Sequence, residues 1–187
     1  MIDSKGKLVI ISAPSGTGKG TVIKELLKLR PDYRFSVSST TRQPRPGEID
    51  GVAYYFVSHE QFNKMIDNNE FLEHAQFVGE HYGTPIKPIN EHISNGQTVI
   101  LDIEVQGAKQ VMSKDIDPIS IFLIAPSMEE LENRLRGRGT DSEDKLIARL
   151  EQARNELEEK KHYDHVVVND KASRAAKEIL SIIEGKE

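Results

Sequence analysis

The chain has 187 residues but contains no cysteine, no tryptophan and no long apolar run. Without cysteine it forms no disulfide, thiolate metal site or cysteine nucleophile, so redox chemistry by the polypeptide itself is not expected. No segment approaches the ~20 apolar residues that cross a bilayer, so we expect no membrane contact. The formal net charge of -5 argues against an extended nucleic-acid surface, and we expect no nucleic-acid partner.

The sequence also lacks signals for export and for a histidine metal site. Only the four apolar residues 8–11 follow Lys5 and Lys7, whereas a secretory signal has a core of ~7 to 15 apolar residues. We therefore expect a cytoplasmic location. The six histidines show no spacing typical of zinc sites, and we interpret them as surface or partly buried residues.

A glycine-rich segment lies between the apolar strand pattern 8–11 and an amphipathic helix pattern that runs to about residue 29. In such a loop the glycines let backbone N–H groups converge on phosphate oxygens, and Lys19 reaches the β- and γ-phosphates. The pattern is imperfect, because Ala13 replaces its first glycine and Gly20 replaces the residue that supplies a hydroxyl to Mg²⁺. An ordinary glycine-rich turn is the alternative. The segment predicts a nucleoside triphosphate site made of Ala13, Pro14, Ser15, Gly16, Thr17, Gly18, Lys19, Gly20 and Thr21.

Strand and helix patterns alternate along the rest of the chain. Ser58 and Gln61 form the capping-box pattern that opens a helix, and the apolar run 98–103 is typical of a buried parallel strand. This alternation predicts an α/β fold whose parallel sheet is covered by helices on both faces, with a β-rich insertion in its middle section. The expected strands are 35–38, 53–57, 71–78, 98–103, 119–124 and 165–168, and the expected helices cover 58 to about 69, the segment after 107, 127 to about 135 and the segment from about 172.

Asp102 ends the buried strand pattern at the position where a phosphate-loop enzyme places the acidic residue that orients a metal ion or its water. An ordinary carboxylate at a strand end is the alternative. With no hydroxyl at Gly20, we expect Asp102 to hold Mg²⁺ through water.

The arginines gather in two segments. Arg42 and Arg45 lie in a proline-interrupted loop, and five more follow in the last third of the chain at 134, 136, 138, 149 and 154. Arg134 and Arg138 would share a helix face, but glycines at 137 and 139 interrupt it and indicate a mobile lid. Positive charge around a moving phosphoryl group favours its transfer. Alternatively, these arginines pair with nearby acidic residues on solvated faces.

Several further motifs follow one another along the chain, namely residues 36–42 with Pro44, Arg45, Gly47, Glu48, Gly51 and Tyr54, then 69–73, 82–84, 100–103 with 106–107, 134–139 and 167–170. They resemble the motifs of guanylate kinases in the same order, and the first resembles the GMP-binding segment of that family. The resemblance spans nearly the whole chain. It implies a single domain with a phosphate-loop core at about 1–37, 85–133 and 151–187, a GMP-binding subdomain at about 38–84 and a helical lid at about 134–150.

The resemblance also implies an activity, namely reversible transfer of the γ-phosphoryl group of ATP to GMP with Mg²⁺, in purine nucleotide metabolism. ATP and GMP are then the substrates, and dGMP is expected as a further acceptor. Asn169 matches a position near the adenine of ATP. The matching residues with an implied catalytic role are Lys19, Arg42, Arg134, Arg138 and Arg149; those implied to contact GMP are Ser38, Arg42, Arg45, Tyr54, Glu73, Tyr82, Thr84 and Asp102.

The implied base contacts suit guanine. Guanine presents N1–H and N2–H donors beside the O6 acceptor, which a carboxylate at Glu73 and hydroxyls at Ser38 and Thr84 complement. Adenine reverses this polarity, and unpaired buried polar groups reject such an analogue by as much as ~10⁴-fold. Two alternatives stay open at this point: a related module that binds a protein partner, and a kinase for another nucleoside monophosphate.

Overall fold

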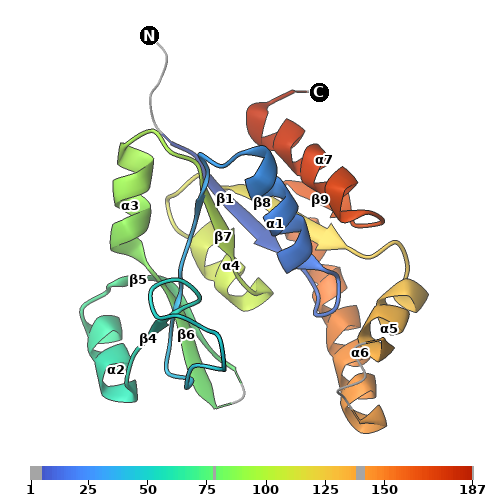
Figure 1. Cartoon of the computed structure of the whole chain (residues 1–187), viewed down its shortest axis with the longest axis horizontal. Coiled ribbons are helices and arrows are strands. Elements are labelled where there is room, and N and C mark those ends of the chain that lie inside the picture. The colour runs from blue at the N-terminus through green and yellow to red at the C-terminus, as the bar shows by residue number, and fades with distance from the viewer. Residues whose placement is uncertain (1–5, 78, 138–141, 187) are drawn as a thin grey trace.

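The computed structural model describes residues 6–77, 79–137 and 142–186 of the chain. Its core is a five-stranded sheet in the order β2-β7-β1-β8-β9, and all neighbouring strands in it are parallel (Figure 1). The strands are β1 (Leu8–Ser12), β2 (Arg34–Phe35), β7 (Val99–Asp102), β8 (Ile119–Ile124) and β9 (His165–Val168). The expected α/β fold with a parallel sheet is confirmed.

Each face of this sheet carries its own apolar cluster, because successive residues of a strand point to opposite faces. Val9 and Ile11 of β1 pack with α1 (Lys19–Leu29) and α7 (Ala172–Glu184). Leu8 and Ile10 belong to the other cluster, with α3 (Ile86–Ser94) and α4 (Val105–Met112). Helices therefore cover both faces, as the alternating pattern predicts.

A second sheet is built from the middle of the chain, in the order β4-β3-β6-β5. Its strands are β3 (Ser39–Thr40), β4 (Tyr55–Phe56), β5 (Phe71–Phe77) and β6 (Glu80–Pro85). The helix α2 (His59–Asp67) begins with the capping box of Ser58 and Gln61 and packs the buried Phe62 ring 4.5 Å from the Phe71 ring. This sheet is the β-rich insertion that the sequence predicts.

The strand expected over 35–38 is wrong, because the chain passes from one sheet to the other there. β2 ends at Phe35 and β3 begins at Ser39. The Ser36 N–H still donates to the Ile100 carbonyl of the core sheet at 3.0 Å, whereas the Ser38 carbonyl accepts from the Tyr55 N–H of the second sheet at 2.9 Å. Alternation of apolar residues indicates an extended chain but not the sheet to which it belongs.

The helix expected after Gly107 is also wrong in its start, because α4 begins at Val105 and includes this glycine. The local sequence patterns did not predict α3, β6 or α6 (Glu143–Leu157), although the helical lid implied by the resemblance covers the first part of α6. The expected strand bounds of β8 and β9 and the start of α7 are confirmed.

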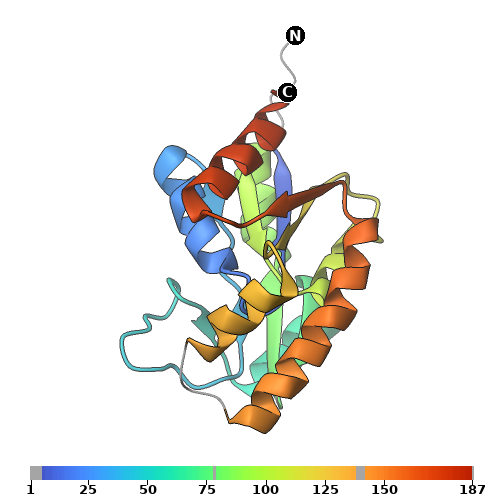
Figure 2. The same cartoon turned by 90° about the vertical axis from the view of Figure 1, so that its right-hand side faces the viewer.

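Two helices lie side by side beyond the core sheet (Figure 2). Ser127 caps α5 (Met128–Arg136) by accepting from the Glu130 N–H at 3.1 Å, and α5 packs on α6 through a third apolar cluster centred on Leu131, Leu135 and Leu150. A short 3₁₀ helix, Glu158–His162, follows α6. No helix within the described ranges has the length and apolarity that crossing a membrane requires.

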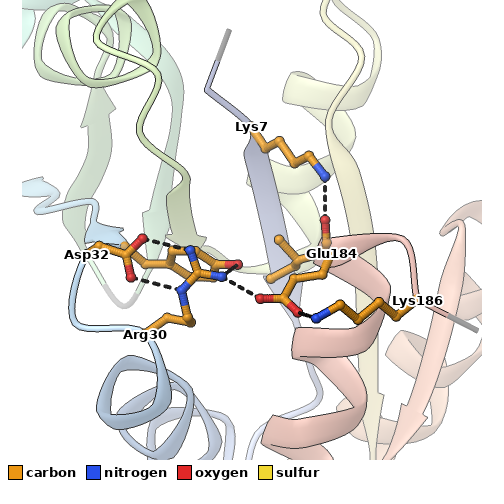
Figure 3. Close-up of polar contacts among 7 residues, drawn as sticks. Lys7, Arg30, Asp32, Glu184 and Lys186 are labelled. Carbon is orange, nitrogen blue, oxygen red and sulfur yellow. Dashed lines mark hydrogen bonds and ion pairs between the residues drawn. The ribbon is translucent and has the colours of Figure 1, made fainter. Parts of the chain in front are cut away.

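A polar cluster ties the C-terminal ends of α1 and α7 together at the amino end of β1 (Figure 3). The Arg30 guanidinium donates to both carboxylate oxygens of Asp32, at 2.9 and 2.7 Å, and to Glu184, which also pairs with Lys186. Lys7, just before β1, donates to the Ile183 carbonyl. This cluster lies at the end of β1 opposite the glycine loop, so it is separate from the site described next.

Candidate functional site

The glycine loop between β1 and α1 lines a cavity of about 340 Å³. Gly16 and Gly18 have left-handed backbone conformations, with φ of 92° and 91°, and α1 begins directly after Gly18. The first turn of a helix leaves N–H groups unpaired and carries partial positive charge, so this cavity suits phosphate. All nine predicted loop residues, Ala13, Pro14, Ser15, Gly16, Thr17, Gly18, Lys19, Gly20 and Thr21, line it, together with Lys24 and Glu104.

Lys19 connects this loop to the carboxyl end of β7. Its Nζ lies 2.9 Å from an Asp102 carboxylate oxygen and 3.7 Å from one of Glu104, and it donates to the Ile103 carbonyl at 3.1 Å. Burial opposes its charge, but the two carboxylates outweigh burial and raise the pKa of the Lys19 ammonium. Lys19 therefore stays cationic at neutral pH. The structure brings together Lys19 and Asp102, which the sequence singles out separately.

The donor set around Asp102 fits Mg²⁺ only if substrate and water complete the coordination. The described residues contain no group of three or more acidic or histidine side chains that could hold a metal ion. Mg²⁺ usually takes one or two carboxylates, several waters and substrate phosphates. Asp102, 28% exposed, and the more exposed Glu104 can supply those carboxylates beside the phosphate cavity, and Gly20 supplies no side-chain ligand.

Three polar side chains form a chain of contacts in the second sheet. Glu73 of β5 and Thr84 of β6 are paired across the strands, and the Thr84 hydroxyl donates to the Glu73 carboxylate. The Ser38 hydroxyl lies 3.4 Å from the Thr84 hydroxyl. Glu73 is only 7% exposed, and this burial raises the pKa of its carboxyl although the Thr84 hydrogen bonds partly counteract it. The structure thus assembles the carboxylate and both hydroxyls that the resemblance assigns to the base.

Helix α4 of the core packs against Glu73 and its strand β5, through residues to which the sequence patterns gave no role. A Cβ at Gly107 would lie 2.3 Å from a Glu73 carboxylate oxygen, so only glycine allows the carboxylate this close to the helix. Gln110 exchanges hydrogen bonds with the backbone of His74, at 2.7 and 3.2 Å. Since Gly107 stands in one of the family-like motifs, the motif itself was the signal for its importance.

A second cationic group lies on the loop after β3. Arg42 is half-buried, and its guanidinium carbon lies 5.4 Å from the centre of the Tyr54 ring, which is itself 6.0 Å from the Tyr82 ring. Its guanidinium pairs with Glu48, and hydrogen bonding to that carboxylate is the main cause that raises the pKa of Arg42. Arg45 is exposed. The structure therefore groups Arg42, Tyr54 and Tyr82, and it pairs Arg42 with Glu48, which stands in the GMP-binding motif but was given no role from the sequence.

Arg134 of α5 fastens that helix to the glycine loop. It donates to the Thr17 carbonyl at 3.1 Å, to the Asn169 carbonyl at 3.0 Å and to Glu130 at 2.8 Å. The Asn169 side chain is buried and donates to the same Thr17 carbonyl at 2.7 Å. A Cβ at Gly18 would lie 2.8 Å from that amide nitrogen. Arg134 and Asn169 thus hold the loop through the Thr17 carbonyl, although neither lines the cavity itself.

Two further arginines belong to the lid that the resemblance implies, and one of them lies in the described part of the chain. Arg149 lies within α6, and Arg138 lies outside the described residues, as do 139–141. The interruption of the helix expected at Gly137 is confirmed, because α5 ends at Arg136 with Gly137 as its cap. Arg136 pairs with Glu132 and Glu143, as the alternative of exposed ion pairs predicts, whereas Arg134 combines such a pair with its contacts to the loop.

Comparison with known proteins gives one consistent result. The family model described as guanylate kinase matches residues 5–186. A guanylate kinase of Prochlorococcus marinus is 51% identical over 95% of this chain and 96% of its own length, and one of Oceanobacillus iheyensis is 47% identical over 100% and 90%. The crystal structure of guanylate kinase from Anaplasma phagocytophilum superposes with a TM-score of 0.78 at 35% identity, covering 98% of this chain and 87% of that one.

Proposed function

Because the chain belongs to the guanylate kinase family, we propose that it transfers the γ-phosphoryl group of ATP to GMP and releases ADP and GDP. The observation that carries this proposal is the pairing of two different sites. One is a phosphate cavity with the cationic Lys19. The other is a buried carboxylate with two hydroxyls, which complements a guanine edge.

On the donor side, we assign the phosphates of ATP to the glycine loop. The N-terminus of α1 and Lys19 supply positive charge there, and Arg134 and Asn169 hold the loop in shape through the Thr17 carbonyl. We also propose that Asn169 lies near the adenine of ATP, as the resemblance implies. Mg²⁺ is the proposed cofactor, held by Asp102 directly or through water, and when bound it would neutralise phosphate charge.

On the acceptor side, we assign the guanine to Glu73, Thr84 and Ser38. An ionised Glu73 accepts from N1–H and N2–H. Of the two hydroxyls proposed for O6, Ser38 can donate to it while Thr84 keeps its single proton on Glu73. The GMP phosphate is assigned to Arg42, Arg45, Tyr54 and Tyr82, because a guanidinium fork matches two phosphate oxygens. We propose Asp102 both for the GMP side, as the resemblance implies, and for the metal, as its pairing with Lys19 beside the phosphate cavity supports.

The chemistry requires positioning rather than covalent catalysis. A phosphate oxygen of GMP is a competent nucleophile at neutral pH, so no general base is needed for direct in-line transfer. What opposes the reaction is repulsion between two anionic substrates. Lys19 and the arginines offset that repulsion at fixed positions, and exclusion of water disfavours hydrolysis of ATP.

We also propose that residues about 38–84 form a GMP-binding subdomain and about 134–150 a lid, and that both close over the substrates. Arg134 and Arg149 support the lid, since they stand on the two helices beyond the phosphate loop. Closure predicts a smaller radius of gyration in solution scattering when GMP and a non-hydrolysable ATP analogue are added together. An unchanged radius would count against it.

The activity is tested by coupling ADP release to an optical readout with each of several acceptors, namely GMP, dGMP, AMP, UMP, CMP and dTMP. We expect turnover with GMP and dGMP to exceed that with every other base. Faster turnover with a pyrimidine or adenine nucleotide would overturn the assignment to guanine. Nucleotide binding without any turnover would favour a binding module over an enzyme. The cytoplasmic location expected from the sequence stays a prediction.

A further inference from the structure

The carboxylate of Glu48 lies against the Arg42 guanidinium in a two-point contact. Nη1 of Arg42 donates to one carboxylate oxygen at 3.0 Å, and Nη2 donates to the other at 2.9 Å. The two side chains are only 15% and 22% exposed. A second donor of Nη1 binds the Gln43 carbonyl at 2.7 Å. The Glu48 carboxylate and the Gln43 carbonyl therefore hold the Arg42 guanidinium before any substrate binds.

The pattern of these bonds decides which edge of the guanidinium stays available. A guanidinium has five N–H donors in a rigid plane. Glu48 takes one donor of Nη1 and one of Nη2, which form the end-on edge, and the Gln43 carbonyl takes the other donor of Nη1. The two remaining donors, Nε–H and the outer Nη2–H, point the same way. They form the side-on fork, which binds two oxygens of one phosphate. Besides Glu48, the side chain hydrogen-bonded to the Arg42 guanidinium among the described residues is Tyr82, which is itself assigned to the GMP phosphate.

The surroundings keep the guanidinium in this orientation. Its carbon lies 5.4 Å from the centre of the Tyr54 ring and 5.8 Å from that of Phe56. An arginine side chain has large rotational freedom, and holding it in place in advance lowers the entropy lost when a ligand binds. Glu48 and the aromatic rings together provide that restraint.

The loop is shaped to present Glu48. The Glu48 N–H donates to the Arg45 carbonyl at 3.0 Å, and the Arg45 N–H donates back to the Glu48 carboxylate at 2.7 Å. Gly47, with φ of 86°, supplies the left-handed residue of this turn. The carboxylate is therefore fixed to the backbone of the same turn that carries Arg45, and it is not a freely rotating surface anion.

We propose that Glu48 is a positioning residue for the acceptor nucleotide, which holds the end-on edge of Arg42 so that its side-on fork faces the GMP phosphate. The inference rests on the proposed function, since it takes GMP as the ligand of Arg42. The opposite reading is that Glu48 competes with the phosphate for Arg42. The two differ in sign: loss of a positioning carboxylate weakens GMP binding, whereas loss of a competitor strengthens it.

The experiment compares Glu48→Gln with the wild-type chain in the coupled assay. Glutamine keeps the size of the side chain and an acceptor for the Arg45 N–H, but it removes the charge and opposes an amide N–H₂ to the guanidinium. We expect KM for GMP to rise about tenfold, with kcat and KM for ATP changed less than about twofold. Glu60→Gln is the matched control, because Glu60 pairs only at the surface of α2 with Lys64; it should leave all three constants unchanged.

A double-mutant cycle tests whether Glu48 acts through Arg42. In an Arg42→Ala background, Glu48→Gln should change KM for GMP less than about twofold, because the group that it positions is absent. An unchanged or lowered KM in the single variant, or an undiminished effect in the Arg42→Ala background, would overturn the inference. A wild-type chain that does not use GMP would instead overturn the proposed function, so the two failures are distinguishable.

Discussion

Replacing Glu73 with glutamine removes the one buried carboxylate of the proposed base site while keeping the shape of the side chain. Glu73 is 7% exposed, and one of its oxygens accepts from the Thr84 hydroxyl. The glutamine carbonyl can keep that bond, so its N–H₂ group then faces the base. Guanine presents N1–H and N2–H at this edge, and donor would face donor.

The size of the effect follows from the two bonds lost. A hydrogen bond to a charged group contributes ~1.5–3 kcal/mol, so losing two lowers kcat/KM for GMP by about 10²- to 10⁴-fold. Solvent does not replace these bonds, because the site is buried. AMP, which has an acceptor at N1, should lose nothing and is expected to gain. The ratio of kcat/KM for GMP to that for AMP should therefore fall by more than the GMP value alone.

The assay is coupled ADP release with GMP and with AMP over a range of concentrations, with KM for ATP as the internal control. Thermal unfolding of both proteins checks that the variant keeps its stability. A fall of less than about fivefold in kcat/KM for GMP would refute the reasoning. An equal fall for GMP and AMP would also refute it, since that result would place Glu73 in catalysis or folding and not in base recognition.

Three other predictions concern the same site and the core. Burial raises the pKa of the Glu73 carboxyl, and only the ionised carboxylate accepts from guanine. KM for GMP should therefore rise as the pH falls through this raised pKa, which lies above the pKa of a free glutamate. The Glu73→Gln variant should lack this pH dependence, and KM for ATP should not show it. Gly107→Ala places a Cβ 2.3 Å from the Glu73 carboxylate, so KM for GMP should rise at least about tenfold with KM for ATP unchanged in the coupled assay. Leu26→Ala removes a fully buried side chain between α1 and the core sheet and should lower the free energy of unfolding by about 2–5 kcal/mol in urea, with KM for both substrates retained. Unchanged constants for Gly107→Ala, or an unchanged urea midpoint for Leu26→Ala, would contradict the structure.

Elements with a strong local signal were predicted well. The strands β8 and β9 have the predicted bounds because each is short and rich in isoleucine or valine, with a single polar residue in each, Ser120 and His165, and α2 begins at its predicted capping box. Local signals did not predict those elements whose sequence patterns are weak. α3 contains an internal proline, and α6 is rich in charge, so neither stood out as an amphipathic helix.

The candidate site likewise divides into features that the sequence predicted and contacts that it did not. The residue types of the base site and of the phosphate site were predicted from motifs that resemble a family. Their mutual contacts were not, because no local pattern relates Lys19 to Asp102, or Glu73 to Gly107. Glu48 stands in the GMP-binding motif, but its role was not predicted, because only the turn that presents it to Arg42 shows which group it contacts.

By itself the sequence determined the glycine loop, the strands and helices with strong local patterns and the chemistry of the side chains, since these depend on bonds and periodicities within a few residues. Only the tertiary structure decided which groups meet. It joined Ser38, Thr84 and Glu73 by pairing strands within the insertion. It also brought Arg134 to the Thr17 carbonyl, although the two residues lie far apart in the sequence. Such contacts arise when distant segments bury their apolar faces together, and that packing is a property of the whole chain.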